Sequence, residues 1–490
     1  MPIGDTWPGT GAGTGLLMAD HPTTPRLWTT LLLAGAAGGL GWGIRGQYGH
    51  QTGAMVPGVL VGLVLVMQFG RHLSSLSAAR AVALTAIAIA WGGCMTYGQT
   101  VGLTHDAELR GNWGALSWGM LGLFIKGAIW IGPAGAVLGM ALGERRYGTR
   151  EWIVLLLVLI GVMFLGRLLL NYPFDPAARR LPPIYFSDHW HWEPHKADLR
   201  PRGERWGGLL LAFAALRIYT GWFRKDRLAS GMAGAAALAG GIGFALGQSV
   251  QALHAWRPDL FEWSPLAALT RHMNWWNLME IIFGTTMAVG LAIGLWLLRR
   301  RIGRDRTGDD TAPLHPVVDT VLLLACAAII VVWEFGSFDW LEFIADMALP
   351  LALLPIVAVT AGRLGPYLFC LPLIALPIAG KTLRQLSYRT DLVPVIPGRL
   401  YLVVLPLAVM IAAALLLART RRSCASTFAP TALLVTSWTY FLLNFAIFEF
   451  PWPWQPSTFR TPSNWIFVVC VLALTIGAIV AAARTRASDV

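Results

Sequence analysis

Charged residues are scarce in this chain, and their scarcity argues against a soluble fold. Only 13% of the 490 residues are charged and 56% are hydrophobic, whereas charged residues make up about a quarter of a soluble domain. The hydrophobic residues fall in long blocks, and uncharged runs long enough to cross about 30 Å of hydrocarbon recur along the chain. This composition is typical of an integral membrane protein.

Cysteines and common catalytic motifs are also few. The five cysteines are dispersed singly, which argues against a disulfide framework and against a zinc knuckle. The AGKT segment at 379–382 has Ala375 where a Walker A loop needs its first glycine, and the HExxH, GxSxG and CxxC motifs are missing. None of these motifs therefore indicates a reaction.

The formal net charge of +12 comes from arginines that cluster in short loops, such as RRRIGRDR at 299–306 and RTRR at 419–422. Basic loops between hydrophobic runs are the pattern of cytoplasmic loops in a membrane protein. The expected partner of this charge is therefore the lipid bilayer, and no nucleic-acid partner is expected.

The hydrophobic runs predict an all-α, polytopic membrane protein with about fourteen transmembrane helices. The helices are expected near 27–44, 54–70, 78–101, 113–142, 151–170, 206–223, 229–253, 275–298, 317–334, 340–361, 365–381, 399–418, 429–448 and 465–483. Basic residues concentrate in every second loop, which places both termini in the cytoplasm and the chain in the cell inner (cytoplasmic) membrane.

The same pattern divides the chain into segments. Residues 1–25, rich in Gly, Thr and Pro, are expected to be a disordered tail. A first transmembrane half at 26–300 contains the longest outer loop, 171–205, and a cytoplasmic linker at 301–316 leads to a second transmembrane half at 317–484. Residues 485–490 form a C-terminal tail.

An internal repeat is the strongest pattern in the first half. WGGCMTYGQTVGLTH at 91–105 and GGIGFALGQSVQALH at 240–254 share two Gly, one Gln, one Val and one His at identical spacing. The following helix opens alike in both copies, with Asn112 and Trp113 matching Asn274 and Trp275. Because both copies run outward at the same point, we expect a parallel pseudo-repeat with a site at its interface.

Charged residues inside hydrophobic runs are candidates for function, because burying a charge in a membrane is costly. Glu280 stands out, since it lies about one and a half turns inside its helix, where a carboxyl can serve as a proton carrier or general base. A structural hydrogen bond or an ion pair with Lys126 is the alternative. Glu342 and Asp346, spaced i, i+4, form a second acidic candidate patch.

The remaining candidate site residues lie at outer helix ends. We expect His105 and His254 to act with Glu280 in proton transfer. The candidate solute-binding residues are Arg45, Gln47, Gln99, Arg110, Asn112, Trp113, Gln248, Arg271, Asn274 and Trp275. The arginines suit a carboxylate or phosphate, and lipid headgroups are their alternative ligands.

A metal site is a further candidate in the outer loop. In an extended segment His189 and His191 would point the same way, and with His195 and Glu193 or Asp198 they could hold Zn or Cu. A polar loop lying on the lipid headgroups through its tryptophans explains the same residues without a metal.

Three functions are compatible with these patterns. The first is a proton-coupled secondary transporter of a small polar solute, expected to be anionic, that binds in an outward-facing polar cavity. The second is a membrane-embedded glycosyl or acyl transferase that uses a lipid-linked donor at the extracytoplasmic face. The third is a non-catalytic subunit or scaffold of a membrane complex. A polar route that continues toward the cytoplasm would favour transport, whereas a closed outer cavity would favour the enzyme.

Overall fold

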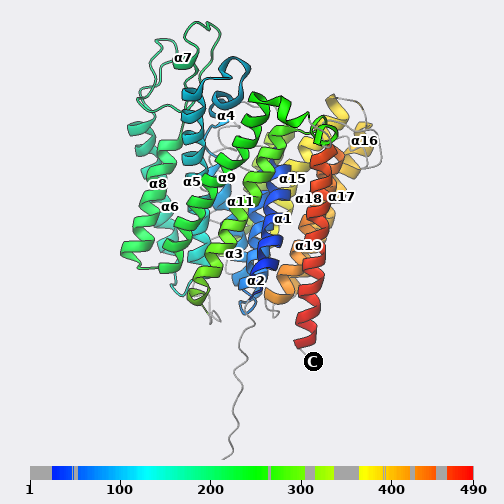
Figure 1. The fold of residues 1–490 in the computed structure, drawn as a ribbon. Coiled ribbons are helices and arrows are strands. Elements are labelled where there is room, and N and C mark those ends of the chain that lie inside the picture. The colour runs from blue at the N-terminus through cyan, green and yellow to red at the C-terminus, as the bar shows by residue number, and fades with distance from the viewer. Residues whose placement is uncertain are drawn as a thin grey trace, which may run out of the picture.

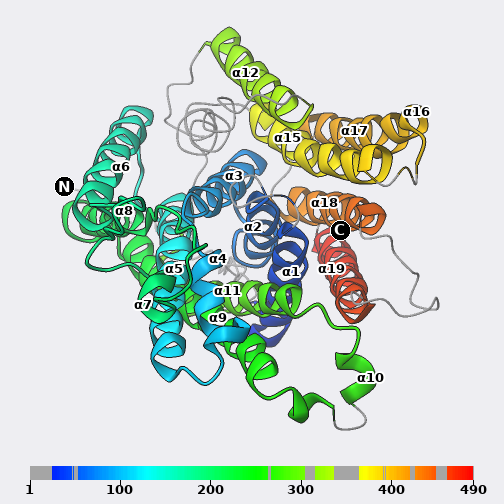
Figure 2. The same cartoon turned by 90° about the horizontal axis from the view of Figure 1, so that it is seen from above.

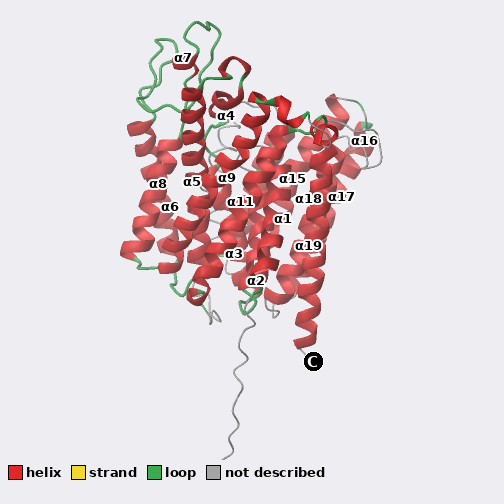
Figure 3. Ribbon diagram, in the orientation of Figure 1, coloured by secondary structure: helices red, strands yellow, loops and turns green. Residues whose placement is uncertain are grey.

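The computed structural model describes most of the chain, namely residues 25–46, 48, 53–262, 266–303, 315–335, 364–389, 391, 393–419, 425–447 and 461–488. In these residues the regular elements are helices, apart from two isolated bridges, as Figure 3 shows. The candidates Gln47, Glu342 and Asp346, with the run at 340–361, lie outside the described residues.

Eight described helices or helical segments are long and apolar enough to cross a membrane. Six are α1 (Leu27–Arg45), α3 (Ser75–Gly92), α5 (Trp113–Leu142), α6 (Thr149–Leu170), α9 (Arg227–Trp256) and α11 (Trp275–Leu298). The others are the segment Val395–Ala418, which includes α17 (Leu405–Arg419), and α19 (Thr461–Ser488). Helices of this length and composition make the chain a multi-pass membrane protein.

Five further helices lie in the same bundle (Figures 1 and 2), and one of them is central. They are α2 (Met55–Phe69), α8 (Trp206–Ile218), α12 (Pro316–Phe335), α15 (Leu364–Leu383) and α18 (Ala425–Ile447). Every residue of α2 is buried, and Figure 2 shows α2 between α1, α3 and α18. A helix that is apolar on all sides needs such a position inside the protein.

Small residues bring the central helices into backbone contact. A Cβ atom added to Gly284 of α11 would overlap the carbonyl oxygen of Gly38 in α1, and one added to Gly127 of α5 would overlap that of Gly240 in α9. Because lipid is as apolar as a leucine side chain, close packing of this kind drives helix association in membranes. The glycines in these runs therefore serve packing.

The two ends of the bundle differ in composition. The end at which α5 and α11 finish and α9 begins carries Arg145, Arg146, Arg224, Lys225 and Arg299–Arg301 and is called the basic end. The opposite end, called the histidine end, carries His105, His189, His191, His195, His254 and His272 with the short helices α4 (Gly98–His105) and α7 (His189–Trp192). Figure 1 shows α4 and α7 at the top, opposite the C-terminus.

The expected helix at 78–101 is interrupted, which corrects the prediction. Helix α3 ends at Gly92 and α4 begins at Gly98. Gly92 lies directly against Trp130, where a Cβ atom would overlap the indole, and the Thr96 carbonyl in the break accepts a bond from Lys126 at 2.7 Å. A side chain of α5 therefore takes the place of a helical hydrogen bond, as happens at broken helices in membrane proteins.

Candidate functional site

Arg45 and Glu280 form a buried ion pair between α1 and α11. The Arg45 Nη2 and Glu280 Oε1 atoms are 3.0 Å apart, and the two side chains are 2% and 3% exposed. Helix α1 ends at Arg45, and Glu280 is the sixth residue of α11. The pair therefore lies on the histidine-end side of the bundle, where these helices cross.

Aromatic rings surround the guanidinium group of Arg45. Its Cζ atom lies 5.2 Å from the ring centroid of Trp42, 5.8 Å from that of Tyr97 and 5.4 Å from that of Trp130. Arg45 Nη2 also donates to the Tyr97 hydroxyl at 2.6 Å. Ring faces attract a cation and keep water away from it, so these rings add to the attraction of Glu280 for the charge of Arg45.

The chain after α1 passes closely over the Glu280 carboxylate. A Cβ atom on Gly46 would overlap that carboxylate, so any larger residue at this position would displace the Glu280 side chain. Asn277, in the same turn of α11, donates through Nδ2 to the Gly43 carbonyl at 2.7 Å. Glu280 is thus placed by contacts from both α1 and α11.

The alternative partner expected for Glu280 was Lys126, and this expectation is wrong. Lys126 pairs with Glu204, with Nζ and Oε1 2.6 Å apart and both side chains fully buried. Lys126 Nζ also donates to the Thr100 hydroxyl at 2.7 Å. The sequence patterns did not indicate Glu204, although it stands two residues before α8, which begins at Trp206.

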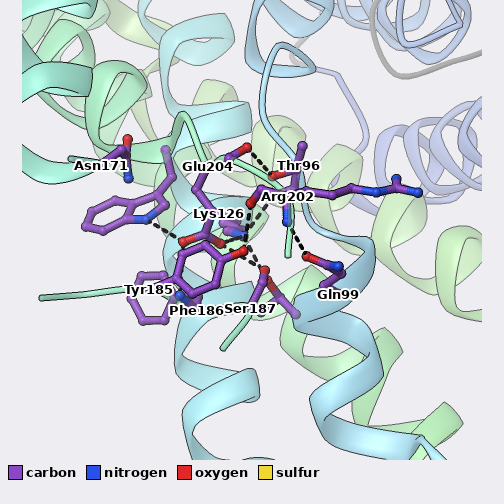
Figure 4. Close-up of polar contacts among 12 residues, drawn as sticks. Thr96, Gln99, Lys126, Asn171, Tyr185, Phe186, Ser187, Arg202 and Glu204 are labelled. Atoms are coloured by element: carbon purple, nitrogen blue, oxygen red, sulfur yellow. Dashed lines mark hydrogen bonds and ion pairs between the residues drawn. The ribbon is translucent and has the colours of Figure 1, made fainter. Parts of the chain in front are cut away.

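Glu204 ties the end of the outer loop to the bundle (Figure 4). It accepts hydrogen bonds from the backbone N–H of Phe186 at 3.0 Å, the Ser187 hydroxyl at 3.0 Å and the Trp206 indole at 3.2 Å. A buried carboxylate with one cation and several donors is fully satisfied. This arrangement fits a structural role better than a reactive one.

The helix ends of the two similar segments lie beside each other. Gln248 Nε2 in α9 donates to the Thr104 hydroxyl in α4 at 2.7 Å, and the Trp256 indole donates to the Thr104 carbonyl at 2.9 Å. Gln99, by contrast, holds the outer loop, because its amide donates to the Arg200 carbonyl and accepts from the Arg202 N–H. The two glutamines therefore contact different partners.

The two histidines of these segments also have different surroundings. His105 Nδ1 lies 3.1 Å from the Val101 carbonyl and 3.6 Å from a carboxylate oxygen of Asp106. The His254 ring stacks on Trp275 with centroids 3.8 Å apart. None of these contacts joins His105 or His254 to Glu280, so proton transfer between these histidines and Glu280 stays a prediction.

Asn112 and Asn274 have the same local role. The Asn112 Oδ1 atom accepts from the Ala115 N–H at 3.0 Å, and the Asn274 Oδ1 atom accepts from the Asn277 N–H at 3.0 Å. Each asparagine is thus the N-cap of its helix, α5 or α11. Capping of a first helical turn favours asparagine, which gives a structural reason for the repeated Asn-Trp pair.

Arginines and tryptophans at the histidine end remain accessible. Arg110 and Arg271 are exposed, and Trp113 is 70% exposed and lies with its ring centroid 5.0 Å from that of Trp256. These groups can reach a ligand or a lipid headgroup directly, unlike Arg45.

The outer loop does not place its histidines as a metal site requires. His189 and His191 lie in the helical turn α7, so their side chains do not point the same way as they would in an extended segment. His189 Nδ1 contacts Glu193 Oε2 at 2.9 Å, and His195 is exposed. In the part of the chain that the structure describes, no three His, Cys, Asp or Glu side chains gather to hold Zn or Cu.

No protein-family model and no curated protein sequence matches the chain. A function must therefore be argued from the geometry and chemistry of the site.

Proposed function

We propose that this protein is a proton-coupled secondary transporter of a small anionic solute, with Arg45 and Glu280 as its coupling site. The observation that carries the proposal is the pairing of a buried arginine with an acid that can accept a proton. A neutral acid cannot balance the charge of the guanidinium, whereas an anionic solute can. Proton and solute would then bind to the same state of the protein.

The energetics of a buried pair support this exchange. Leaving one charge of such a pair without a partner costs about 3–5 kcal/mol. Protonation of Glu280 would remove its ion pair with Arg45, and a carboxylate or phosphate could take the place of that ion pair through bidentate hydrogen bonds. The aromatic rings of Trp42 and Trp130 would hold the guanidinium in place during the exchange.

Packing of α5 against α9 near the basic end agrees with a carrier closed on that side. The two helices meet through Gly139 and Ala229, where a Cβ on the glycine would approach the alanine Cα to 2.5 Å. This contact leaves no room for a solute between these two helices. We propose that the described arrangement is closed toward the basic end and that the transport cycle opens it.

The finer topology belongs to the same proposal. We propose about fourteen spans, an inner-membrane location and cytoplasmic termini, because the basic residues gather at one end of the bundle. We also propose that α3 to α5 and α9 to α11 descend from a duplication. The matching N-caps at Asn112 and Asn274 and the adjacent ends of α4 and α9 support that origin.

A membrane enzyme that uses a lipid-linked donor is the second candidate. It is favoured by the exposed Arg110, Arg271 and Trp113 at the histidine end. Arginines bind phosphate and an indole can stack on a sugar or headgroup, so this surface offers both contacts without any passage through the bundle.

Reconstitution separates the two candidates. Purified protein in liposomes should accumulate a labelled small anion, from a panel of mono- and dicarboxylates and phosphate, only when the outside is more acidic than the lumen. The same preparation should not modify a lipid-linked sugar or acyl donor. Formation of a lipid-linked product without uptake would contradict the transporter proposal and favour the enzyme. Uptake that does not respond to the pH gradient would remove proton coupling.

A further inference from the structure

A polar cavity at the basic end lies far from the Arg45–Glu280 pair. It has a volume of about 340 Å³ and lies between the end of α8 and the first turns of α9. Two arginines, Arg217 and Arg227, line it, together with the glycines Gly221, Gly231 and Gly234. The proposed transport function assigns no role to these residues.

The backbone around the cavity is shaped to hold the Arg217 guanidinium. Arg217 Nη1 donates to the Ser230 carbonyl at 3.2 Å. A Cβ atom on Gly234 would lie 2.7 Å from that nitrogen, so the guanidinium can rest on α9 because Gly234 has no side chain. Helix α8 continues into a π-helical turn, Tyr219–Phe223, and turns of this kind are frequent at functional sites.

The charge that the cavity offers to a ligand is positive. Asp226 is the acid among the residues that line it, but Asp226 is buried and its carboxylate is used by two neighbours. One oxygen accepts from the Ala229 N–H at 2.9 Å, and the other accepts from the Tyr147 hydroxyl at 2.9 Å. The two exposed guanidinium groups of Arg217 and Arg227 are therefore the charges offered to a ligand, and phosphate suits their fork geometry.

Apolar side chains beside the cavity indicate that a phosphate bound there belongs to a lipid headgroup. Ile218 at the end of α8 is 56% exposed, and Trp222 and Phe223 in the π-turn that follows are 79% and 72% exposed. Exposed aromatic residues next to basic ones mark the headgroup level of a bilayer. We propose that this cavity binds the phosphate headgroup of an anionic phospholipid, with the acyl chains lying along the apolar surface of α8.

Lipid retention by the purified protein tests this site. In native mass spectrometry the wild-type protein should retain phosphatidylglycerol in preference to phosphatidylcholine. Arg217→Gln and Arg227→Gln should each weaken phosphatidylglycerol binding about fivefold, and the double variant about 25-fold, since one basic residue near a membrane surface contributes a free energy of that size. Gly234→Ala should also weaken binding, because it displaces the guanidinium without removing a charge.

Arg150→Gln is the matched control. Arg150 is exposed at the same end and lines no part of the cavity, so its loss should leave lipid binding unchanged. Elution profile and unfolding temperature in lipid-free detergent verify that each variant is folded. Wild-type phosphatidylglycerol binding by the folded double variant would overturn the site. Equal protection by inorganic phosphate at the same concentration, with displacement of the lipid, would overturn the assignment to a lipid.

Discussion

Lys126 and Glu204 are separated by 78 residues in the sequence, yet their Nζ and Oε1 atoms lie 2.6 Å apart with no exposed surface on either side chain. Lys126 belongs to α5, and Glu204 ends the loop that covers the histidine end. The pair therefore fixes this loop to the membrane domain.

Removal of either charge should destabilise the protein more than removal of both. Lys126→Met leaves the Glu204 carboxylate buried without a cation, and Glu204→Gln leaves an unbalanced ammonium. Each change should lower the free energy of unfolding by about 3–5 kcal/mol. The double variant should lose clearly less than the sum, as a double-mutant cycle of unfolding in detergent micelles can measure. Lys196→Met is the control. The Lys196 side chain is 39% exposed in its ion pair with Glu193, so this change should cost less than about 1 kcal/mol. Strictly additive losses would contradict the pairing.

The fold could be predicted from the sequence where a hydrophobic run decides the structure. The expected ranges 113–142 and 275–298 match α5 and α11 to the residue, because Asn112 and Asn274 cap their first turns. The break between α3 and α4 could not be predicted, since it depends on Trp130 and Lys126 of another helix. Periodicity describes one segment at a time and carries no information on such contacts.

The candidate site shows the same limit. Glu280 was identified because a charge inside a span is costly, and Arg45 because an arginine at an outer helix end suits a carboxylate or phosphate. Their pairing across 235 residues is a tertiary contact that neither local pattern contains. Both asparagines of the repeated Asn-Trp motif are helix caps, which their role as candidate binding residues did not indicate, and their binding of a solute stays a prediction.

Close packing of α1 against α11 makes Gly284 sensitive to substitution. In Gly284→Ala the new methyl group would overlap the Gly38 carbonyl and the Cβ atom of Trp42. Overpacking of this kind costs about 1–3 kcal/mol, which a shift in thermal unfolding can detect. Gly161→Ala is the control, because nothing lies within 4 Å of its new Cβ, and it should gain about 0.5–1 kcal/mol of helix stability. Equal behaviour of the two variants would contradict the backbone contact.

The proposed orientation predicts which residues react from which side. Ala178 lies in the outer loop and Gly148 in a loop at the basic end, and both are exposed. In a background with the five native cysteines replaced by serine, Ala178→Cys should react in intact cells with a membrane-impermeant thiol reagent. Gly148→Cys should react only after the membrane is opened. Labelling of both positions in intact cells would refute the topology.

The Tyr147 hydroxyl should stabilise the loop at the basic end through Asp226. Burial, and then the negative charge of Asp226, raise the pKa of the Tyr147 phenol above its usual range, so the hydroxyl stays protonated and donates to the carboxylate. Tyr147→Phe should therefore lose about 1 kcal/mol at neutral pH. Because the folded pKa is raised, the advantage of the wild type should persist to about pH 10 and then decline as the pH rises through the folded value. A constant difference above pH 10 would contradict this assignment.

Glu280→Gln tests the coupling site most directly. The amide keeps the shape of the side chain and can accept a bond from Arg45, but it can neither carry a charge nor take up a proton. If Glu280 couples proton to solute, the variant should lose uptake driven by a pH gradient while still exchanging labelled for unlabelled solute. If Glu280→Gln kept the full response of uptake to the pH gradient, Glu280 would not be the coupling residue.

Thermal unfolding of the same variant distinguishes coupling from a structural role. In this variant Arg45 loses the ion pair in which its Nη2 atom lies 3.0 Å from the Glu280 carboxylate, which should lower stability by about 3–5 kcal/mol. An anionic solute that binds Arg45 should restore part of this loss, so the unfolding temperature of Glu280→Gln should rise more on addition of solute than that of the wild type, which already has an internal counter-ion. Lys126→Met should be destabilised without any such recovery, because its unpaired group is an acid. A solute that protects Glu280→Gln and the wild type equally would show that the anion binds elsewhere and that the Arg45–Glu280 pair is structural.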